Sequence, residues 1–272
     1  MATLTTEVSP AQTATSGQRV VELSFDEVTP EFASKWARLE VNSVEGNAFL
    51  SPHFAIPAVN HLEGSYDQKP LILAVESEDG AELLALGLFE ISRNSRLLPL
   101  IHLQSWRCEH TLFDGLLVDK QSGSAALDTF FEWLSKQGRR WNGIAFTDRS
   151  ADGELNDMLE NAAAKTNATW FEDWSRERAV VPIAEVPDDC LQTLYSKNRR
   201  RNFKRSTKQL ATFGEVSYSF ADKANTTAKD VQAFLELEAM GWKGEEGTAL
   251  LSSTGHEQFC RQMATRFAAD QR

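Results

Sequence analysis

The stretch Leu71 to Ser92, LILAVESEDGAELLALGLFEIS, holds two apolar runs on either side of Asp79-Gly80. Asp-Gly between two such runs is a strong signal for a tight hairpin turn. The stretch therefore predicts two paired strands, Leu71 to Glu76 and Glu82 to Ser92. A third strand-like stretch runs from about Arg96 to Arg107.

One strand and two helix starts precede this hairpin. Val20 to Phe25 (VVELSF) alternates apolar and polar residues as a half-buried strand does. Thr29-Pro30 and Ser51-Pro52 each place a capping residue before a proline, the usual start of a helix. Apolar residues three or four apart follow both pairs, so we expect two helices here, the second ending near Gly64.

Helix and strand patterns alternate after the hairpin. We expect a helix, a strand, a helix and two closing strands, in the order Ser124 to Gln137, Asn142 to Thr147, Asp152 to Thr166, Ala168 to Trp174 and Glu177 to Ile183. Gly138 should end the first of these helices in a left-handed conformation. The whole order is then strand, two helices, three strands, helix, strand, helix and two strands.

The pattern starts again after a helical connector. Three blocks match earlier ones at offsets of 195, 198 and 201 residues: EVSYSF (215–220) on VVELSF (20–25), TAKDVQAFLELEA (227–239) on TPEFASKWARLEV (29–41), and EGTALLS (246–252) on EGNAFLS (45–51). We interpret these ordered matches as a tandem duplication of one fold. The alternative is a chance alignment of common helix-capping patterns.

The duplication predicts an incomplete second copy. Arg272 corresponds to about position 71 of the first copy, so the sequence stops about one third of the way through the second. Helices 228–240 and 256–268 would then leave apolar faces uncovered by a sheet. These faces comprise Val231, Phe234 and Leu235 in the first helix and Phe259, Met263 and Phe267 in the second.

Composition and charge narrow the function classes. The 272 residues carry a net charge of −11, which argues against non-specific binding to nucleic acids or membranes. No apolar run approaches the roughly 18 residues of a membrane span, and the first 18 residues predict a disordered tail rather than a signal peptide. The three cysteines, Cys108, Cys190 and Cys260, have no zinc spacing and are interpreted as reduced thiols of a cytoplasmic protein.

The order of elements resembles that of the GNAT superfamily of N-acetyltransferases. Three further stretches resemble the tandem-GNAT cellulose-biosynthesis (CelD-type) acetyltransferases, which are related in architecture to the Fem-type aminoacyltransferases: Leu191 to Gly214 (LQTLYSKNRRRNFKRSTKQLATFG), Gly241-Trp242-Lys243-Gly244 with Gly247-Thr248-Ala249, and Asn47 to Pro52. The resemblance implies an α/β fold with a mixed sheet flanked by helices, in one complete copy plus the first third (β-α-α) of a second. The expected parts are a tail (1–18), a first GNAT-like domain (19–184), a basic helical connector (185–214) and the start of a second domain (215–272).

The resemblance implies an acyl-CoA-dependent N-acyltransferase. Acetyl-CoA or another acyl-CoA would be the co-substrate, no metal would be needed, and the acceptor would be a small molecule such as an amino sugar or a polysaccharide or cell-envelope precursor. If the second copy carries catalysis, this chain would itself be inactive. Two alternatives remain open: a non-catalytic module that binds a polyanion or a protein partner through the basic segment, and a Fem-like transferase that uses aminoacyl-tRNA. Nucleic acid is expected as a partner only in the second of these alternatives.

A GNAT fold holds the pyrophosphate of coenzyme A on backbone amides at the start of a helix. The corresponding residues are Lys120, Gln121, Ser122, Gly123, Ser124 and Ala125, with Lys where the family has Gln or Arg. Unpaired amides and the helix dipole favour an anion at such a place. The same six residues could equally form a solvent-exposed loop that caps the helix.

The segment 197–208 is the one strongly basic stretch, with a charge of +7 and no acid. On a helix, Lys197, Arg201, Lys204 and Lys208 would form one line about 16 Å long. With Arg199, Arg200 and Arg205 they could bind the phosphates of coenzyme A, a nucleotide sugar or tRNA. The alternatives are a solvated helix or one packed on the acidic remainder of the chain.

Trp242 and Lys243 would help to shape the acceptor pocket, unless Trp242 is buried in a core. Candidates for the base that deprotonates the acceptor amine are Glu90, Glu109, His110 and Asp114, although each could be an ordinary solvated side chain. No serine-hydrolase elbow, Walker loop, zinc-protease motif or Rossmann fingerprint is present. The sequence thus gives no support to those enzyme classes.

Overall fold

A computed structural model of the chain describes residues 17–62, 69–93, 100–138, 140–179, 190–217 and 228–270. A six-stranded sheet lies at the centre of the first half. Its strands are β1 (Arg19–Ser24), β2 (Leu71–Glu76), β3 (Leu83–Ser92), β4 (His102–Ser105), β5 (Leu117–Val118) and β6 (Ile144–Ala145). The order across the sheet is β1-β2-β3-β4-β6, and β5 pairs with β3.

The sheet is mixed. Strands β1 to β4 pair antiparallel with their neighbours, whereas β4 and β6 are parallel. The predicted turn between β2 and β3 is confirmed, since Gly80 has a φ of 69° and its amide bonds the carbonyl of Ser77 at 2.9 Å. Parallel neighbours need a crossover, and here a helix between β5 and β6 supplies it.

Strands β4 and β5 both pair with β3. β4 pairs with the far half of β3, from Phe89 to Ser92, and β5 pairs with Ala85 and Leu86. The loop 106–116 therefore leaves the sheet in the middle of what is geometrically one strand. This interruption brings polar side chains of the loop to the centre of the sheet edge.

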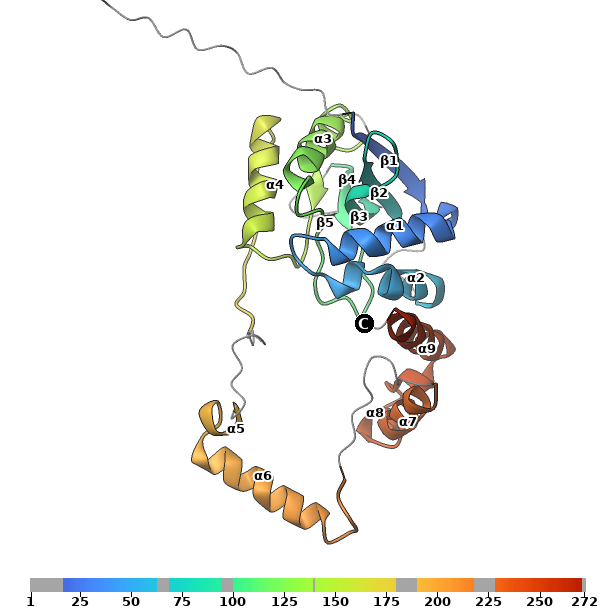
Figure 1. Cartoon of the computed structure of the whole chain (residues 1–272), viewed down its shortest axis with the longest axis vertical. Helices are drawn as coiled ribbons and strands as arrows, with labels where there is room; N and C mark the ends of the chain where they lie inside the picture. The colour runs from blue at the N-terminus through green and yellow to red at the C-terminus, as the bar shows by residue number, and fades with distance from the viewer. Residues whose placement is uncertain are drawn as a thin grey trace, which may run out of the picture.

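Two pairs of helices cover the two faces of the sheet (Figure 1). α1 (Pro30–Val41) and α2 (Pro52–His61) share one core with Leu86 and Leu88. α3 (Gly123–Ser135) and α4 (Glu154–Lys165) share the other core with Phe89. Adjacent residues of β3 thus face opposite layers, as the two-residue period of a strand requires. The predicted α/β fold with a mixed sheet flanked by helices is confirmed.

The helix starts follow the sequence signals. Thr29 Oγ1 accepts from the amide of Phe32 at 3.1 Å, and Ser51 Oγ accepts from the amide of His53 at 3.2 Å. Each bond satisfies one amide that the first helical turn leaves without a partner. The predicted left-handed stop at Gly138 is wrong: α3 ends at Ser135 with Lys136 as its right-handed cap, and Gly138 does not have a positive φ.

The two predicted closing strands are also wrong where the structure describes them. Residues 168–179 form no strand, and residues 180–183 lie outside the described part of the chain. Instead of pairing with β6, the segment runs past its edge and lines a large pocket. Its aromatic residues, Trp170, Phe171 and Trp174, all line that pocket.

The second half is helical in the residues that the structure describes. Its elements are α5 (Cys190–Thr193), α6 (Lys197–Leu210), α7 (Ala228–Ala239), α8 (Trp242–Glu245), the 3₁₀ turn η4 (Leu250–Ser252) and α9 (Thr254–Ala269). Within the predicted connector, residues 190–193 and 197–210 are helical and residues 185–189 lie outside the described residues; both following helices are confirmed. Of the strand predicted at 215–220, residues 215–217 are not strand and the rest lies outside the described residues.

The last helix packs on the first domain, contrary to the expectation that its apolar face is uncovered. Phe259 belongs to the core of α1 and α2 and meets Phe54 edge to face at 5.3 Å. Met263 and Phe267 pack against the same core, and Figure 1 shows α9 beside α2. On α7 the expectation is confirmed for Phe234, which is exposed, and wrong for Leu235, which is completely buried, while Val231 is partly exposed.

Cys108 and Cys260 are free and buried, while the side chain of Cys190 lies outside the described part of the molecule. Among the described helices, none is long and apolar enough to cross a membrane.

Candidate functional site

Glu90 lies near the end of β3 on the face that also carries Leu88. Its side chain is only 7% exposed, and Oε1 has no hydrogen-bond partner among the described residues. Burial raises the pKa of this carboxyl to about 7. A buried, unpaired carboxyl with such a pKa is a candidate proton acceptor near neutral pH.

His102 is a buried neighbour that the sequence did not single out. His102 lies on β4 and pairs with Ser92 of β3. It is therefore diagonally across from Glu90 on the same face of the sheet. One ring nitrogen is 2.8 Å from the carbonyl oxygen of Leu100, and the other, Nε2, has no partner among the described residues. The residue directly opposite Glu90 on the neighbouring strand is Gln104. The side-chain amide of Gln104 donates to Thr147 Oγ1 at 2.6 Å.

Asp114 has a different environment from Glu90. Its Oδ2 accepts from Ser105 Oγ at 2.5 Å and from the amides of Thr147 and Asp148 at 2.9 and 3.2 Å. These bonds join the loop 106–116 to the segment that follows β6. The carboxylate thereby bridges the end of β4 and the residues that follow β6.

Glu109 and His110 meet a third residue from the far end of the chain. His256 Nε2, on α9, lies 2.5 Å from Glu109 Oε1. The ring of His110 stacks on Phe259 with centroids 5.2 Å apart and meets the ring of His256 edge to face, also at 5.2 Å. Burial lowers the pKa of His110, more than the nearby Glu109 raises it. His256 is therefore a residue that the sequence prediction missed.

The predicted pyrophosphate loop lies at the start of α3. The amides of Gln121 and Ser122 donate to Asp119 Oδ1 at 3.0 and 2.8 Å. A side chain at Gly123 would place Cβ 2.5 Å from Cγ1 of Val118, so close packing alone requires glycine there. Within the predicted pyrophosphate loop, the amides of Gly123, Ser124 and Ala125 have no hydrogen-bond acceptor among the described residues.

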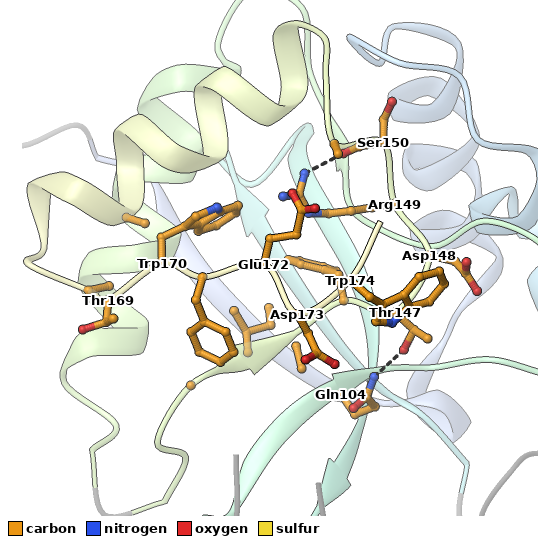
Figure 2. A pocket seen from close by; sticks show the side chains of 18 of the residues that line it. Gln104, Thr147, Asp148, Arg149, Ser150, Thr169, Trp170, Glu172, Asp173 and Trp174 are labelled. Atoms are coloured by element: carbon orange, nitrogen blue, oxygen red, sulfur yellow. Dashed lines mark hydrogen bonds between the residues drawn. The ribbon is translucent and has the colours of Figure 1, made fainter. Parts of the chain in front are cut away.

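A pocket of about 1280 Å³ opens at the free edge of β6. Its walls are the segment after β6, from Phe146 to Asp152, and the segment 168–178. Figure 2 shows Gln104 and Thr147 on one side of the pocket and Arg149 with Trp170 on the other. Such a mixture of aromatic surfaces and a few polar groups is typical of small-molecule sites.

Arg149 is fixed within this pocket. Its Nη1 donates to Asn156 Oδ1 at 2.6 Å and to the carbonyl of Ser150 at 2.7 Å. The guanidinium carbon lies 4.9 Å from the ring centre of Trp170. Burial lowers the pKa of Arg149 from its ordinary value.

Three arginines surround the buried carboxylate of Asp148 beside the pocket. Arg107 and Arg176 approach it at 2.5 Å and Arg178 at 2.8 Å. Arg176 and Arg178 also line the pocket.

The seven basic residues predicted to bind an anion all lie on α6. The helix is exposed along its length, its chief neighbour among the described elements is α5, and Figure 1 shows it away from α3. The apolar seam of Phe203 and Leu210 is exposed as well. The alternative in which α6 packs on the acidic remainder of the chain is therefore wrong.

Trp242 and Lys243 begin α8. Trp242 is 63% exposed, so it is not a core residue. Lys243 Nζ donates to Glu238 Oε1 at 2.5 Å, and Glu238 also accepts from the amide of Leu250. The lysine is thus engaged within the helical segment.

The structure brings some predicted residues together and keeps others apart. Glu109 and His110 form one cluster with His256, and Glu90 neighbours the pocket through Gln104. The loop 120–125 and α6 lie in different parts of the molecule (Figure 1).

Comparisons with known proteins bear on the second half of the chain. No curated protein gives a significant match. A family model described as an acetyltransferase (GNAT) domain matches residues 197–272. The match begins at the first residue of α6 and includes α7, α8 and α9. By this comparison, residues 197–272 are similar to a GNAT acetyltransferase domain, which supports an acyltransferase function.

Proposed function

We propose that the protein is an acyl-CoA-dependent N-acyltransferase. The observation that carries the proposal is the similarity of residues 197–272 to a GNAT acetyltransferase domain. The mixed sheet of the first half, with helices on both faces, supports it. In this reaction the amine of the acceptor attacks the thioester carbonyl directly, the thiol leaves, and no covalent enzyme intermediate forms.

Glu90 is the proposed general base. An ammonium acceptor must lose a proton before it can attack, and a base is most effective when its pKa lies near the working pH. The pKa of Glu90 of about 7 meets this condition. Glu90 does not itself line the pocket, but Gln104, which lies directly opposite it on β4, does.

The proposed acceptor is an amino sugar or a related polysaccharide precursor. Trp170 and Trp174 offer flat apolar surfaces, while Gln104, Thr147 and Asp173 offer hydrogen-bonding groups in the same pocket. A sugar ring presents both kinds of surface. The pocket is also large enough for more than one sugar unit, since common small-molecule sites measure about 300–1,000 Å³.

The pyrophosphate of the acyl-CoA is proposed to bind at the start of α3. The amides of Gly123, Ser124 and Ala125 point out of the first helical turn, where the helix dipole favours an anion. The carboxylate of Asp119 holds the two preceding amides, so the phosphate would use only the later ones.

We further propose that residues 228–269 repeat the helical part of the first half. α7, η4 and α9 occur in the same order as α1, η2 (Ala48–Leu50) and α2, with the additional short α8 between α7 and η4. The sequence matches between these parts support a common origin.

Binding and transfer test the proposal separately. Calorimetric titration with acetyl-CoA should show one binding site. A negative charge at the start of α3 should abolish this binding. Ser124→Asp is the suitable variant, because Ser124 is exposed and an acid near a helix start stabilises the helix while repelling phosphate. Ser124→Ala is the neutral control. Equal binding by native chain and Ser124→Asp would reject this cofactor site, and no binding by the native chain would reject the proposal.

Glu90→Gln tests the base. Release of free coenzyme A thiol with a panel of amino sugars should fall by about 10²–10⁴-fold, while acetyl-CoA still binds. Native activity should rise as the pH passes about 7, because only the deprotonated carboxyl accepts a proton. An unchanged rate in Glu90→Gln would assign the base to another residue.

The raised pKa also predicts a pH-dependent stability. The folded state holds a proton on Glu90 that the unfolded chain releases at lower pH, so this group stabilises the fold below its ordinary pKa of 4.5. That contribution is lost as the pH rises towards about 7. Glu90→Gln should flatten this part of the stability profile, measured by urea unfolding.

A second candidate function is supported by α6. A basic helix with both its charges and its apolar seam exposed suits a polyanion-binding module. Binding of heparin as a probe should then weaken steeply between 50 and 200 mM salt, because each phosphate-like contact releases counterions. Substituting Arg201 and Lys204 by alanine should reduce the slope. Binding of tRNA in place of acetyl-CoA would favour the aminoacyl-tRNA alternative.

A further inference from the structure

The cluster of Glu109, His110 and His256 is a metal-ligand set that the proposed transfer does not use. One ligand atom from each residue lies within 4.8 Å of the others. Two imidazole nitrogens and one carboxylate oxygen are a common ligand set for Zn²⁺. The three ligands come from a turn after β4 and from the start of α9, which are far apart in the sequence.

One pair of ligand atoms is already close to the spacing that they would have around a bound ion. His256 Nε2 and Glu109 Oε1 are 2.5 Å apart. Tetrahedral zinc bonds of about 2.0–2.1 Å place two ligand atoms about 3.3 Å from each other, so this pair would separate by less than about 1 Å. Only side-chain rotations are needed for that change, since the Glu109 side chain is more than half exposed.

His110 supplies a second, independent observation. Its Nε2 is buried and has no hydrogen-bond partner among the described residues. A buried polar atom without a partner is unfavourable, so it calls for a ligand or a structural reason. The stacking of the ring on Phe259, at an angle of 6° between the planes, fixes its orientation beside His256.

We propose that Glu109, His110 and His256 bind one Zn²⁺ ion that joins the loop after β4 to α9. Three protein ligands leave the fourth position to water or to another small ligand. The neighbouring contact between Phe54 and Phe259 holds α9 in place and so brings His256 to the other two ligands. Zinc binding and docking of α9 therefore stabilise each other.

Calorimetric titration of the untagged chain with Zn²⁺ tests the site. We expect one ion per chain. His256→Ala and Glu109→Gln should each weaken binding by at least about 100-fold, more than the loss of an outer contact to a ligand would cause. Glu109→Gln keeps the shape of an exposed side chain, so loss of binding in it cannot be ascribed to unfolding. His61→Gln, a histidine of α2 outside the cluster, is the matched control and should bind as the native chain does.

Co²⁺ identifies the ligand atoms. Its visible spectrum should show a site of nitrogen and oxygen ligands without the thiolate charge-transfer band that Cys108 or Cys260 would cause. Zn²⁺ should also slow proteolysis within α9 in the native chain and not in His256→Ala. A thiolate band, equal affinity in the native chain and both cluster variants, or no binding by the native chain would each overturn the proposal.

Discussion

Two segments of the molecule have the same local structure and differ in burial. Residues 29–61 form α1, η2 and α2, and residues 228–269 form α7, η4 and α9 with the short α8 between. Trp36 in the first segment is completely buried, while Phe234, which the sequence aligns with it, is 54% exposed. Leu39 and its counterpart Leu237 differ in the same way.

The difference separates what local sequence determines from what the sheet determines. A helix and a 3₁₀ turn depend on neighbours along the chain, and both segments have them. Burial depends on a sheet face, and only the first segment lies on one (Figure 1). The second segment obtains its buried surface chiefly from α2, through α9.

The largest expected difference in the free energy of unfolding is between substitutions of Trp36 and of Phe234, which the sequence aligns with it. Trp36→Ala should lower the free energy of unfolding by about 4–5 kcal/mol, because it removes a filled core position and the bond from Nε1 to the carbonyl of Leu50 at 2.8 Å. Phe234→Ala should change it by less than about 0.5 kcal/mol, as exposed substitutions do. Urea unfolding measures both. Similar losses for the two variants would show that α7 is covered in solution.

The contact of α9 with α2 should give the next effect. Phe259→Ala should cost about 3 kcal/mol, because Phe259 is buried against Phe54 in the first core. Proteolysis should then cleave α9 before it cleaves α1 and α2. Phe213→Ala, at an exposed position after α6, is the matched control. Unchanged protection of α9 in Phe259→Ala would contradict the packing described above.

The helix caps should give the smallest contrast. Ser51→Ala should cost about 1 kcal/mol, because Ser51 Oγ accepts from the amide of His53. Ser253 is the N-cap residue of α9 but makes no side-chain capping bond, so Ser253→Ala should cost only a few tenths of a kcal/mol. Thermal unfolding of the two variants side by side checks this. A larger loss in Ser253→Ala would reverse the comparison.

The elements that sequence predicted best are those with local causes. Thr29-Pro30 and Ser51-Pro52 predicted both first helices, and Asp79-Gly80 predicted the hairpin, because capping and turn geometry involve only a few adjacent residues. The strands predicted from 168 to 179 were wrong because apolar and aromatic residues such as Trp170, Phe171 and Trp174 suit a pocket wall as well as a strand.

The parts of the sites that sequence missed depend on distant contacts. Glu109 and His110 were candidates, but His256 has no motif around it and joins them only because α9 packs on α2. The burial of Phe259 was missed for the same reason. Glu90 could be named from its place on a strand, whereas its pKa follows from a burial that only the folded sheet provides.

The packing of α9 on α2 also sets a time scale for synthesis. The two helices are about 200 residues apart along the chain. At about 5–20 residues per second, a ribosome produces α9 roughly 10–40 s after α2. During that interval the surface of α2 around Phe54 has no cover from α9, which makes it a place where a nascent chain can be recognised by chaperones or join a second chain.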